Sequence, residues 1–297
     1  MGNEGVLTHV PQPLRAPFGS ATPAEHQVIR AIDVGGSRDP PPGTAFMDGI
    51  QRYAVVGRFG VIPVVRGYVA AAVMTRQQDT LAVGVHQSEE LIVAPLDRLS
   101  GRQLDQVRQT GIPLYDSGET DRDHPILDVH LAAAVVERRR EETEARVARQ
   151  YLQSGGEEWL VVDGPISQLI EYARAERLLG LVKSHETQFL QGRELITALT
   201  LPVGYRTSVF VRNSRVREDV HTWYLRLWPW EEHDLLHGLI RLERAPVEEP
   251  GPDATEISGW MLSERAPLSA PDGRWDRLIY PIRQVEAYLR TQLGGWL

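Results

Sequence analysis

The chain has 297 residues, and its 42% hydrophobic and 24% charged content is ordinary for a globular protein with an ample core. No apolar run approaches the roughly 20 residues that span a bilayer, and no signal segment opens the chain, so we expect a cytoplasmic protein without a membrane partner. Cysteine is absent, which excludes disulfides, thiolate metal sites and a cysteine nucleophile. The net charge of −8 argues against a protein that coats nucleic acid by bulk electrostatics, but it does not exclude a nuclease.

The first part of the chain predicts an extended arm followed by a meander of antiparallel strands. Residues 1–43 are rich in Pro and Gly, so we expect an extended N-terminal arm or cap ahead of one domain that spans 44–297. Glycines at 57, 60 and 67 break the apolar runs that follow. The expected strands are 45–47, 53–56, 61–65, 68–74, 81–85 and 91–93.

Helices and strands alternate in the rest of the chain. A short helix is expected at 96–110, and Asp128 is expected to cap a long helix over 129–153. Further helices are expected at 166–179, 192–199 and 282–293. Further strands are expected at 159–162, 180–182, 207–211, 222–227 and 236–242, with an acidic loop over 245–256. This order predicts a ribonuclease-H-like α/β fold, a mixed sheet flanked by helices, in which the first and fourth strands bring their acidic ends together.

Two apolar strands end on the dipeptide Asp-Gly. One is Thr44-Ala-Phe-Met-Asp-Gly-Ile50, with Asp48, and the other is Trp159-Leu-Val-Val-Asp-Gly-Pro-Ile166, with Asp163. The glycine lets the backbone turn away and clears space beside the carboxylate. Two such carboxylates on neighbouring strands form the minimal site for divalent ions that act on phosphate esters. We therefore predict that Asp48 and Asp163 are metal ligands and catalytic residues.

A third ligand is expected from the helix over 129–153. At about 100° per residue, Glu141 lies at the centre of a face of small apolar residues, where an unpaired carboxylate is costly. We predict Glu141 as the third metal ligand, with Glu137 one turn away as the next candidate. Glu142 and Glu144 point towards neighbouring arginines and are expected on a solvated, ion-paired surface. A surface role for all of these glutamates is the alternative.

The only lysine of the chain, Lys183, ends an apolar strand that follows Asp163 by one helix. In that position a lysine can contact phosphate or neutralise charge that develops on a phosphoryl group. His185, two residues on, can act as a general acid or base or bind phosphate. The alternative for both is an ordinary polar residue at a strand exit.

The segment 222–230 alternates between two faces, with Trp223 on one and Tyr224 and Arg226 on the other. Such an aromatic and arginine face can stack on unpaired bases, although a packed strand or a subunit contact is the commoner use. Together with the amphipathic helix at 282–293, this strand offers apolar surface beyond what one core needs. That surface favours a homodimer.

Five segments stand in an order and spacing that together resemble the NurA nuclease family. They are Phe46–Ile50, Val161–Ile166, Gly180–His185, Trp223–Leu227 and Leu239–Glu243, and the resemblance covers roughly residues 45 to 295. It implies a ribonuclease-H-like core and a toroidal homodimer that cuts DNA with Mn²⁺ or Mg²⁺. By position, Asp48 and Asp163 match the two strand-end aspartates of the family, and Glu141 best matches its helix glutamate.

The resemblance also implies a partner, a HerA-type hexameric ATPase. It further implies single-strand exo- or endonuclease activity with 5′-to-3′ polarity in DNA end processing, repair or phage defence. Archaeal members carry a C-terminal tyrosine and histidine at the metal site; here Tyr280 supplies the tyrosine, no histidine follows it, and Tyr288 stands near the expected place. The missing histidine motivates a competing hypothesis, a catalytically decayed NurA-like subunit that docks on a translocase ATPase.

Overall fold

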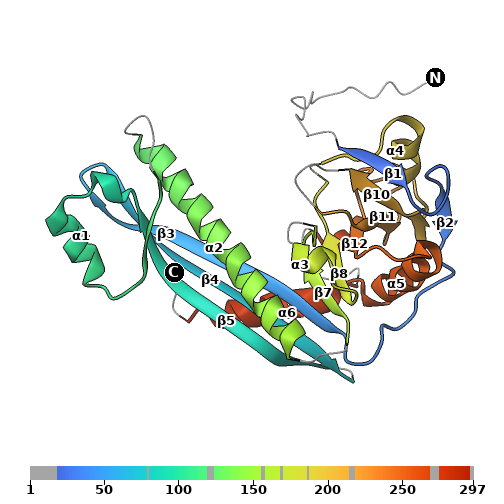
Figure 1. Ribbon diagram of the computed structural model, residues 1–297, viewed down its shortest axis with the longest axis horizontal. Coiled ribbons are helices and arrows are strands. Elements are labelled where there is room, and N and C mark those ends of the chain that lie inside the picture. Colours follow the sequence, from blue (N-terminus) through green and yellow to red (C-terminus); the bar gives the residue numbers. More distant parts are fainter. Residues whose placement is uncertain are drawn as a thin grey trace.

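The computed structural model describes residues 19–78, 80–118, 124–154, 158–167, 170–185, 187–213, 218–267 and 274–294. The molecule is elongated, with three long strands and helix α2 running out from a more compact body (Figure 1). The strands are β1 (Ser20–Pro23), β2 (Ala31–Asp33), β3 (Ala45–Phe59), β4 (Ile62–Gln77), β5 (Thr80–Ala94), β6 (Leu114–Asp116), β7 (Leu160–Asp163), β8 (Leu178–Val182), β9 (Tyr205–Thr207), β10 (Phe210–Asn213), β11 (His221–Arg226) and β12 (Leu239–Arg244). The helices are α1 (Gly101–Arg108), α2 (Pro125–Gln153), α3 (Ile170–Ala173), α4 (Gly192–Leu199), α5 (Pro250–Glu264) and α6 (Tyr280–Thr291), with short 3-10 turns at Leu96–Arg98 and Trp275–Arg277.

One mixed sheet joins the two ends of the molecule. Its strand order is β1-β10-β11-β12-β8-β7-β3-β4-β5-β6, with β2 and β9 attached beside β11. The strands β3, β4 and β5 form an antiparallel meander. Strand β7 then pairs parallel with β3, β8 pairs parallel with β7, and β12 is antiparallel to β8. The prediction of a mixed sheet flanked by helices is confirmed.

The meander differs from the prediction in its strand lengths. The six short strands expected between 45 and 93 are three strands of 15 or 16 residues. Of the three glycines taken as breaks, Gly60 makes the turn with a φ of +61°, and Gly57 marks a shift of register in β3. Gly67 lies within β4, where a Cβ would come 2.8 Å from Val136 of α2. Its role is therefore close packing of a helix on the sheet.

Several helix boundaries also differ from the prediction. Helix α2 begins at Pro125, and His124 rather than Asp128 accepts the capping hydrogen bond. Asp128 is buried inside the first turn, where it pairs with Arg98 at 2.7 Å. The expected helix over 166–179 is the short α3, because β8 already begins at Leu178. The expected loop over 245–256 contains the start of α5, since proline is well tolerated at the first position of a helix.

Two helical layers cover opposite faces of the sheet. Helix α2 packs Val147 and Tyr151 against the β3 face that carries Ala45 and Met47. Helices α5 and α6 pack against the other face, with Ile282, Val285 and Leu289 among the buried residues of that cluster. The apolar face of the C-terminal helix is therefore used within the chain, and the prediction that it offers a dimer surface is wrong. No described helix has both the length and the apolar character needed to cross a bilayer.

The aromatic strand β11 is also buried on both faces. Trp223 is fully buried and donates from Nε1 to Ser258 Oγ of α5 at 3.0 Å. On the other face, Tyr224 is buried, and Arg226 donates to three backbone carbonyls, those of Leu199, Leu235 and His237. Neither face is open to a base, so the stacking hypothesis is wrong and the alternative of a packed strand is correct.

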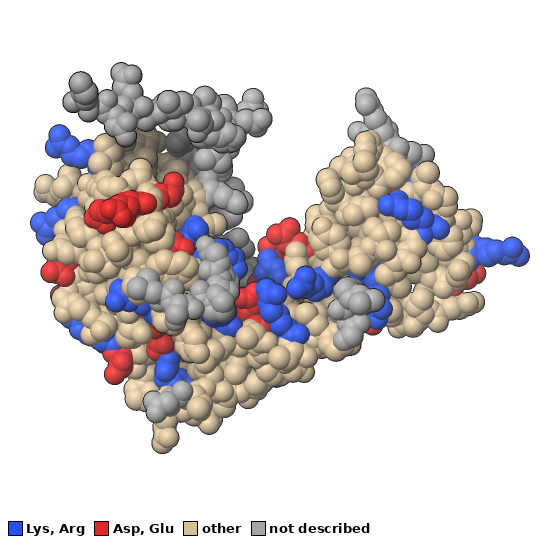
Figure 2. Space-filling model, turned by 180° about the vertical axis from the view of Figure 1, so that it is seen from behind, with Lys and Arg blue, Asp and Glu red and all other residues tan. Residues whose placement is uncertain are grey.

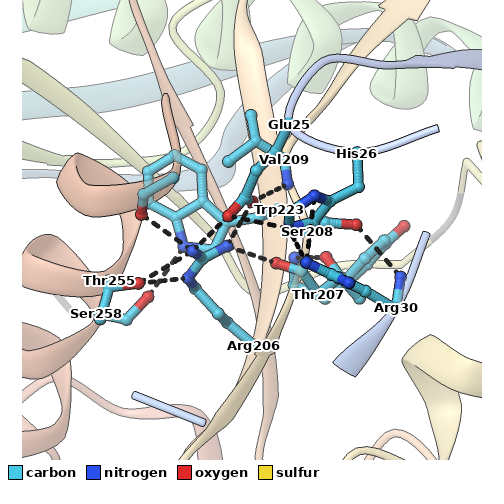
Figure 3. A network of polar contacts seen from close by, with 12 residues as sticks. Glu25, His26, Arg30, Arg206, Thr207, Ser208, Val209, Trp223, Thr255 and Ser258 are labelled. Atoms are coloured by element: carbon cyan, nitrogen blue, oxygen red, sulfur yellow. Dashed lines mark hydrogen bonds and ion pairs between the residues drawn. The ribbon is translucent and has the colours of Figure 1, made fainter. Parts of the chain in front are cut away.

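The segment around Glu25 is tied to the body by a buried ion pair (Figure 3). The Glu25 carboxylate accepts from Arg206 Nη1 at 2.7 Å and Nη2 at 2.9 Å, and from the Val209 N–H at 2.9 Å. Arg206, whose side chain is 1% exposed, also donates to Thr255 Oγ1 of α5. Burial alone would raise the pKa of Glu25, but the hydrogen bonds from Arg206 and Val209 hold it below its ordinary value. Strands β1 and β2, on either side of this pair, dock onto β10 and β9.

We expect Arg206→Met to lower the free energy of unfolding by about 3–5 kcal/mol, because it leaves the Glu25 carboxylate buried without its cation. Urea denaturation at neutral pH measures this loss. The double variant Glu25→Gln with Arg206→Met should recover part of it, since no unpaired charge remains. Arg108→Met, on the exposed surface of α1, serves as the control and should leave stability unchanged. Equal stability of Arg206→Met and the wild type would contradict the importance of the pair.

Candidate active site

Two aspartates lie side by side where the parallel strands β3 and β7 meet. The last paired residues of these strands are Met47 and Val162, so Asp48 and Asp163 follow at the next position of each. Lys183 comes directly after β8, and its Nζ lies 2.9 Å from Asp163 Oδ2. The register of three adjacent strands therefore brings together Asp48, Asp163 and Lys183.

The environment of Asp48 is electrostatically unfavourable to its charge. Burial raises the pKa of Asp48 well above its ordinary value, and repulsion from Asp163 raises it further. The Lys183 ammonium and the Gly49 N–H, which donates to Asp48 Oδ1 at 2.7 Å, act in the opposite direction without cancelling the effect. A carboxylate in this state gains from any additional positive charge placed beside it.

Helix α2 contributes Glu144 to the same cluster. The Glu144 carboxylate lies against the backbone of β3, where a Cβ on Gly49 would overlap its Oε1. Its side chain is 17% exposed, and it pairs with Arg140 one turn earlier in the helix. Burial raises the pKa of Glu144 to about 7, and repulsion from Asp163 adds to the effect, whereas Arg140 opposes it. We refer to Asp48, Asp163 and Glu144 as the carboxylate cluster.

The other glutamates of α2 lie further out. Glu141, predicted as the third ligand, has a side chain that is 52% exposed and lies 3.8 Å from Arg140; Glu137 is exposed. The prediction assumed that the face of the helix lined by alanines packs on the sheet. The buried face instead contains Val136, Thr143, Val147 and Tyr151. On that face Glu144, expected on a solvated surface, is the glutamate turned towards β3. Gly49, directly after Asp48, was the sequence feature that could have indicated a glutamate here, because it leaves room for a side chain from the helix.

A cavity of about 350 Å³ adjoins Asp163 and Glu144 between α2 and the sheet. Tyr172 of α3 closes one side of it and donates to the Ala145 carbonyl of α2 at 2.9 Å. The walls combine an acidic rim with an apolar interior. The lining residues are Met47, Arg138, Glu141, Glu142, Glu144, Ala145, Val162, Asp163, Pro165 and Tyr172.

The carboxylate cluster supplies the oxygen ligands that Mg²⁺ and Mn²⁺ prefer. Among the residues that the structure describes, no three His, Cys, Asp or Glu side chains stand close enough to hold an ion as they are arranged. Instead, Asp163 forms an ion pair with Lys183, and Glu144 forms an ion pair with Arg140. Three carboxylates against two cations leave an excess of negative charge, and oxygen donors of this kind are the ones that a divalent cation prefers.

The loop after Asp163 is positioned by a buried glutamate that sequence reasoning did not single out. Glu243 of β12 is fully buried, and its Oε2 accepts from the N–H of Ile166 at 3.0 Å and of Ser167 at 3.3 Å. Burial alone would raise the pKa of Glu243, but Arg241 and Arg212 hold it below its ordinary value. The alternation of Arg241 and Glu243 within an apolar strand is the signal that identifies this charged pair.

The remaining predicted residues lie around the cluster or away from it. His185 bonds to the Leu239 carbonyl at 2.9 Å, and burial lowers its pKa to about 4, so it is neutral at pH 7 and anchored to β12. Tyr280 is 44% exposed at the first residue of α6. Tyr288 packs edge-on against His86 of β5.

Comparison with known proteins gives a likeness among solved structures. No protein-family model matches the chain, and no curated protein matches it. Among solved structures, the chain is similar to the NurA nuclease from Sulfolobus solfataricus, with a TM-score of 0.45 and 9% sequence identity. The alignment covers 94% of this chain and 88% of that one.

The raised pKa of Glu144 makes stability depend on pH. Because the value in the folded protein, about 7, lies above the ordinary 4.5, this contribution is complete below pH 4.5 and is lost as pH rises through 7. We expect Glu144→Gln to remove a pH-dependent loss on the order of 2–3 kcal/mol between pH 4.5 and 8. Thermal unfolding with EDTA across this range measures it. Glu141→Gln, on the exposed side of the helix, is the control; if it flattens the profile as much, Glu144 is not the perturbed group.

Proposed function

We propose that this chain is a divalent-metal-dependent nuclease that hydrolyses phosphodiester bonds in DNA. The observation that carries the proposal is the convergence of Asp48, Asp163 and Glu144, from two parallel strands and a helix, on one partly enclosed place. Buried carboxylates that repel one another are costly, and binding a cation for phosphodiester chemistry explains why they stand together. Asp48, Asp163 and Glu144 would hold the ion.

The charges of the bound ion, Lys183 and Arg140 suggest a separate role for each in the reaction. When bound, a divalent ion supplies Lewis-acid stabilisation of the phosphoryl group and lowers the pKa of a water. Lys183, the single lysine of the chain, stands beside Asp163, where it would contact a phosphate oxygen. Arg140, which pairs with Glu144, would be a second cation beside the scissile group, with the planar geometry that matches phosphate.

The strand order supports a ribonuclease-H-like core. In the series β5-β4-β3-β7-β8, an antiparallel meander is followed by two strands parallel to the first, and α2 leads into β7. From the sequence, the first and fourth strands of such a core are expected to bring their acidic ends together. The five segments that resemble the NurA family extend the proposal to Mn²⁺ or Mg²⁺ as cofactor, a homodimer, and a HerA-type hexameric ATPase as partner in DNA end processing, repair or phage defence.

A second candidate function is a NurA-like interaction subunit without catalytic activity. Two observations favour it: Lys183 and Arg140 already neutralise two of the three carboxylates, and Tyr288, near where the resemblance implies a histidine, packs on β5. An inactive subunit keeps its fold and its motor partner but gains nothing from a divalent ion. The two candidates therefore differ in metal binding as well as in cleavage.

We expect Asp163→Asn and Glu144→Gln to abolish Mn²⁺-dependent release of nucleotides from single-stranded DNA, by at least about 100-fold. Each replacement is close to isosteric, so the fold should persist in circular dichroism. Glu141→Gln is the matched control on the same helix and should keep most of the wild-type rate. Activity that depends on Glu141 and not on Glu144 would contradict the assignment of the helix ligand.

Metal binding separates the two candidate functions without an activity assay. We expect Mn²⁺ at pH 8 to raise the melting temperature of the wild type, since an ion that binds only the folded state stabilises it. Asp163→Asn should lose this response. A wild type that is neither stabilised by Mn²⁺ nor active on DNA would favour the interaction subunit, and a HerA-type ATPase that binds it would then identify its role.

The homodimer proposal is supported by an exposed apolar patch at the β3–β4 hairpin, where Tyr53, Val55, Val56 and Val61 are exposed. We expect light scattering at micromolar concentration to give a dimer, and Val56→Asp with Val61→Asp to give a monomer. Val83→Asp, near the opposite end of the long strands, is the control and should leave the dimer intact. A monomeric wild type would contradict the proposal.

A further inference from the structure

A groove lined by arginines begins where the carboxylate cluster ends. Strand β3 continues beyond Asp48, but its pairing with β7 stops at Met47. From Asp48 onwards, within the described residues, one edge of β3 has no neighbouring strand. A cavity of about 410 Å³ opens along this edge. Its lining residues are Gly49, Ile50, Gln51, Arg52, Arg140, Glu286, Arg290 and Leu293. We call it the arginine groove.

Three elements contribute positive charge to the arginine groove. Arg52 comes from β3, Arg140 from α2 and Arg290 from α6, against one glutamate, Glu286. A smaller cavity of about 290 Å³ on α6 continues the groove and adds Arg283, which lies two turns before Arg290 on the same helix face. Lys and Arg side chains gather at the floor of the hollow between the two ends of the molecule (Figure 2). This local charge contrasts with the net charge of −8 of the whole chain.

The cations of the groove are available to a ligand to different degrees. Arg52 is exposed and makes no ion pair or hydrogen bond with any other described residue. Arg290 is exposed and forms an ion pair with Glu286 of the same helix at 2.6 Å. An exposed pair of this kind contributes little free energy, so a phosphate can replace Glu286 as the partner of Arg290. Arg140 belongs to both places, since it lines the groove and pairs with Glu144 of the carboxylate cluster.

We propose that the arginine groove binds the sugar-phosphate backbone of a single nucleic-acid strand, with Arg52 and Arg290 as its phosphate contacts, and directs that strand to the carboxylate cluster. The proposal rests on the proposed nuclease function and names how its substrate is held. Arginine is suited to the role because its planar group binds phosphate oxygens in pairs. Contacts of this kind position a strand without reading its sequence.

The dimensions of the groove favour one strand over a duplex. Four residues of extended chain separate Asp48 from Arg52, about 13 Å at the rise of a β-strand, which places the arginine within a few nucleotides of the carboxylates. The volume is that of a small-ligand pocket, so it accommodates a sugar-phosphate unit, whereas a base-paired duplex is much wider. The apolar residues Ile50 and Leu293 suit the sugar face of the strand.

The test is binding of a fluorescein-labelled oligothymidylate, measured by anisotropy with EDTA present so that no cleavage occurs. We expect Arg52→Gln and Arg290→Gln each to weaken binding by about fivefold near ~0.1 M salt, and each to reduce the slope of log affinity against log salt by about 0.7. Arg108→Gln, on the exposed surface of α1, is the matched control and should bind like the wild type. Thermal unfolding checks that all variants are folded; both groove arginines are exposed.

Two further probes sharpen the result. The same sequence with uncharged methylphosphonate linkages should bind weakly and equally to all variants, and a blunt duplex should bind more weakly than the single strand. Unchanged affinity and salt slope in both groove variants would overturn the proposal, as would full affinity for the uncharged strand or equal affinity for the duplex. Because binding is read without metal, a wild type that binds through these arginines but does not cleave with Mn²⁺ would refute the nuclease and leave the groove in place.

Discussion

Electrostatic repulsion among Asp48, Asp163 and Glu144 is the constraint around which this end of the sheet is built. Asp48 and Glu144 lie where burial already disfavours their charge, and repulsion from Asp163 adds to the cost. Folding tolerates the arrangement because Lys183 and Arg140 stand beside it and because protonation offers partial relief. A protein that needed only stability would place apolar side chains here. The arrangement supports the proposal that the cluster binds a ligand of opposite charge.

The backbone is shaped to allow this crowding. Gly49 has no Cβ, so the Glu144 carboxylate can lie directly on β3. Gly164 adopts a φ of +121°, which a side chain would disfavour, and a Cβ on Gly180 would come 2.8 Å from the Gly164 carbonyl. Glu243 then fixes the following turn through two backbone N–H groups. These features fix the backbone that follows Asp163, while its carboxylate faces Lys183 and the cavity beside α2.

The alternation of strands and helices was readable from the sequence, because apolar runs are local signals. The strand lengths were not, since, of the three glycines taken as breaks, Gly57 and Gly67 lie within strands and only Gly60 makes a turn. Asp48, Asp163 and Lys183 were placed correctly because the apolar runs before them are local signals. Each lies at or just beyond the last residue of its strand that pairs with a parallel neighbour. The rotation of α2 was not readable, since the choice between Glu141 and Glu144 depends on which face packs on β3, and alanines occur on both. The aromatic strand β11 also gave no local sign that α5 would cover it, because the start of α5 is acidic and rich in proline.

Anomalous scattering from crystals of the protein soaked in manganese would show directly whether the carboxylate cluster binds an ion. We expect one or two peaks within coordination distance of Asp48, Asp163 and Glu144, with Lys183 displaced from Asp163 and Glu141 remaining in solvent. Crystals that keep the Lys183–Asp163 and Arg140–Glu144 pairs, with no peak between the carboxylates in excess manganese, would contradict this expectation.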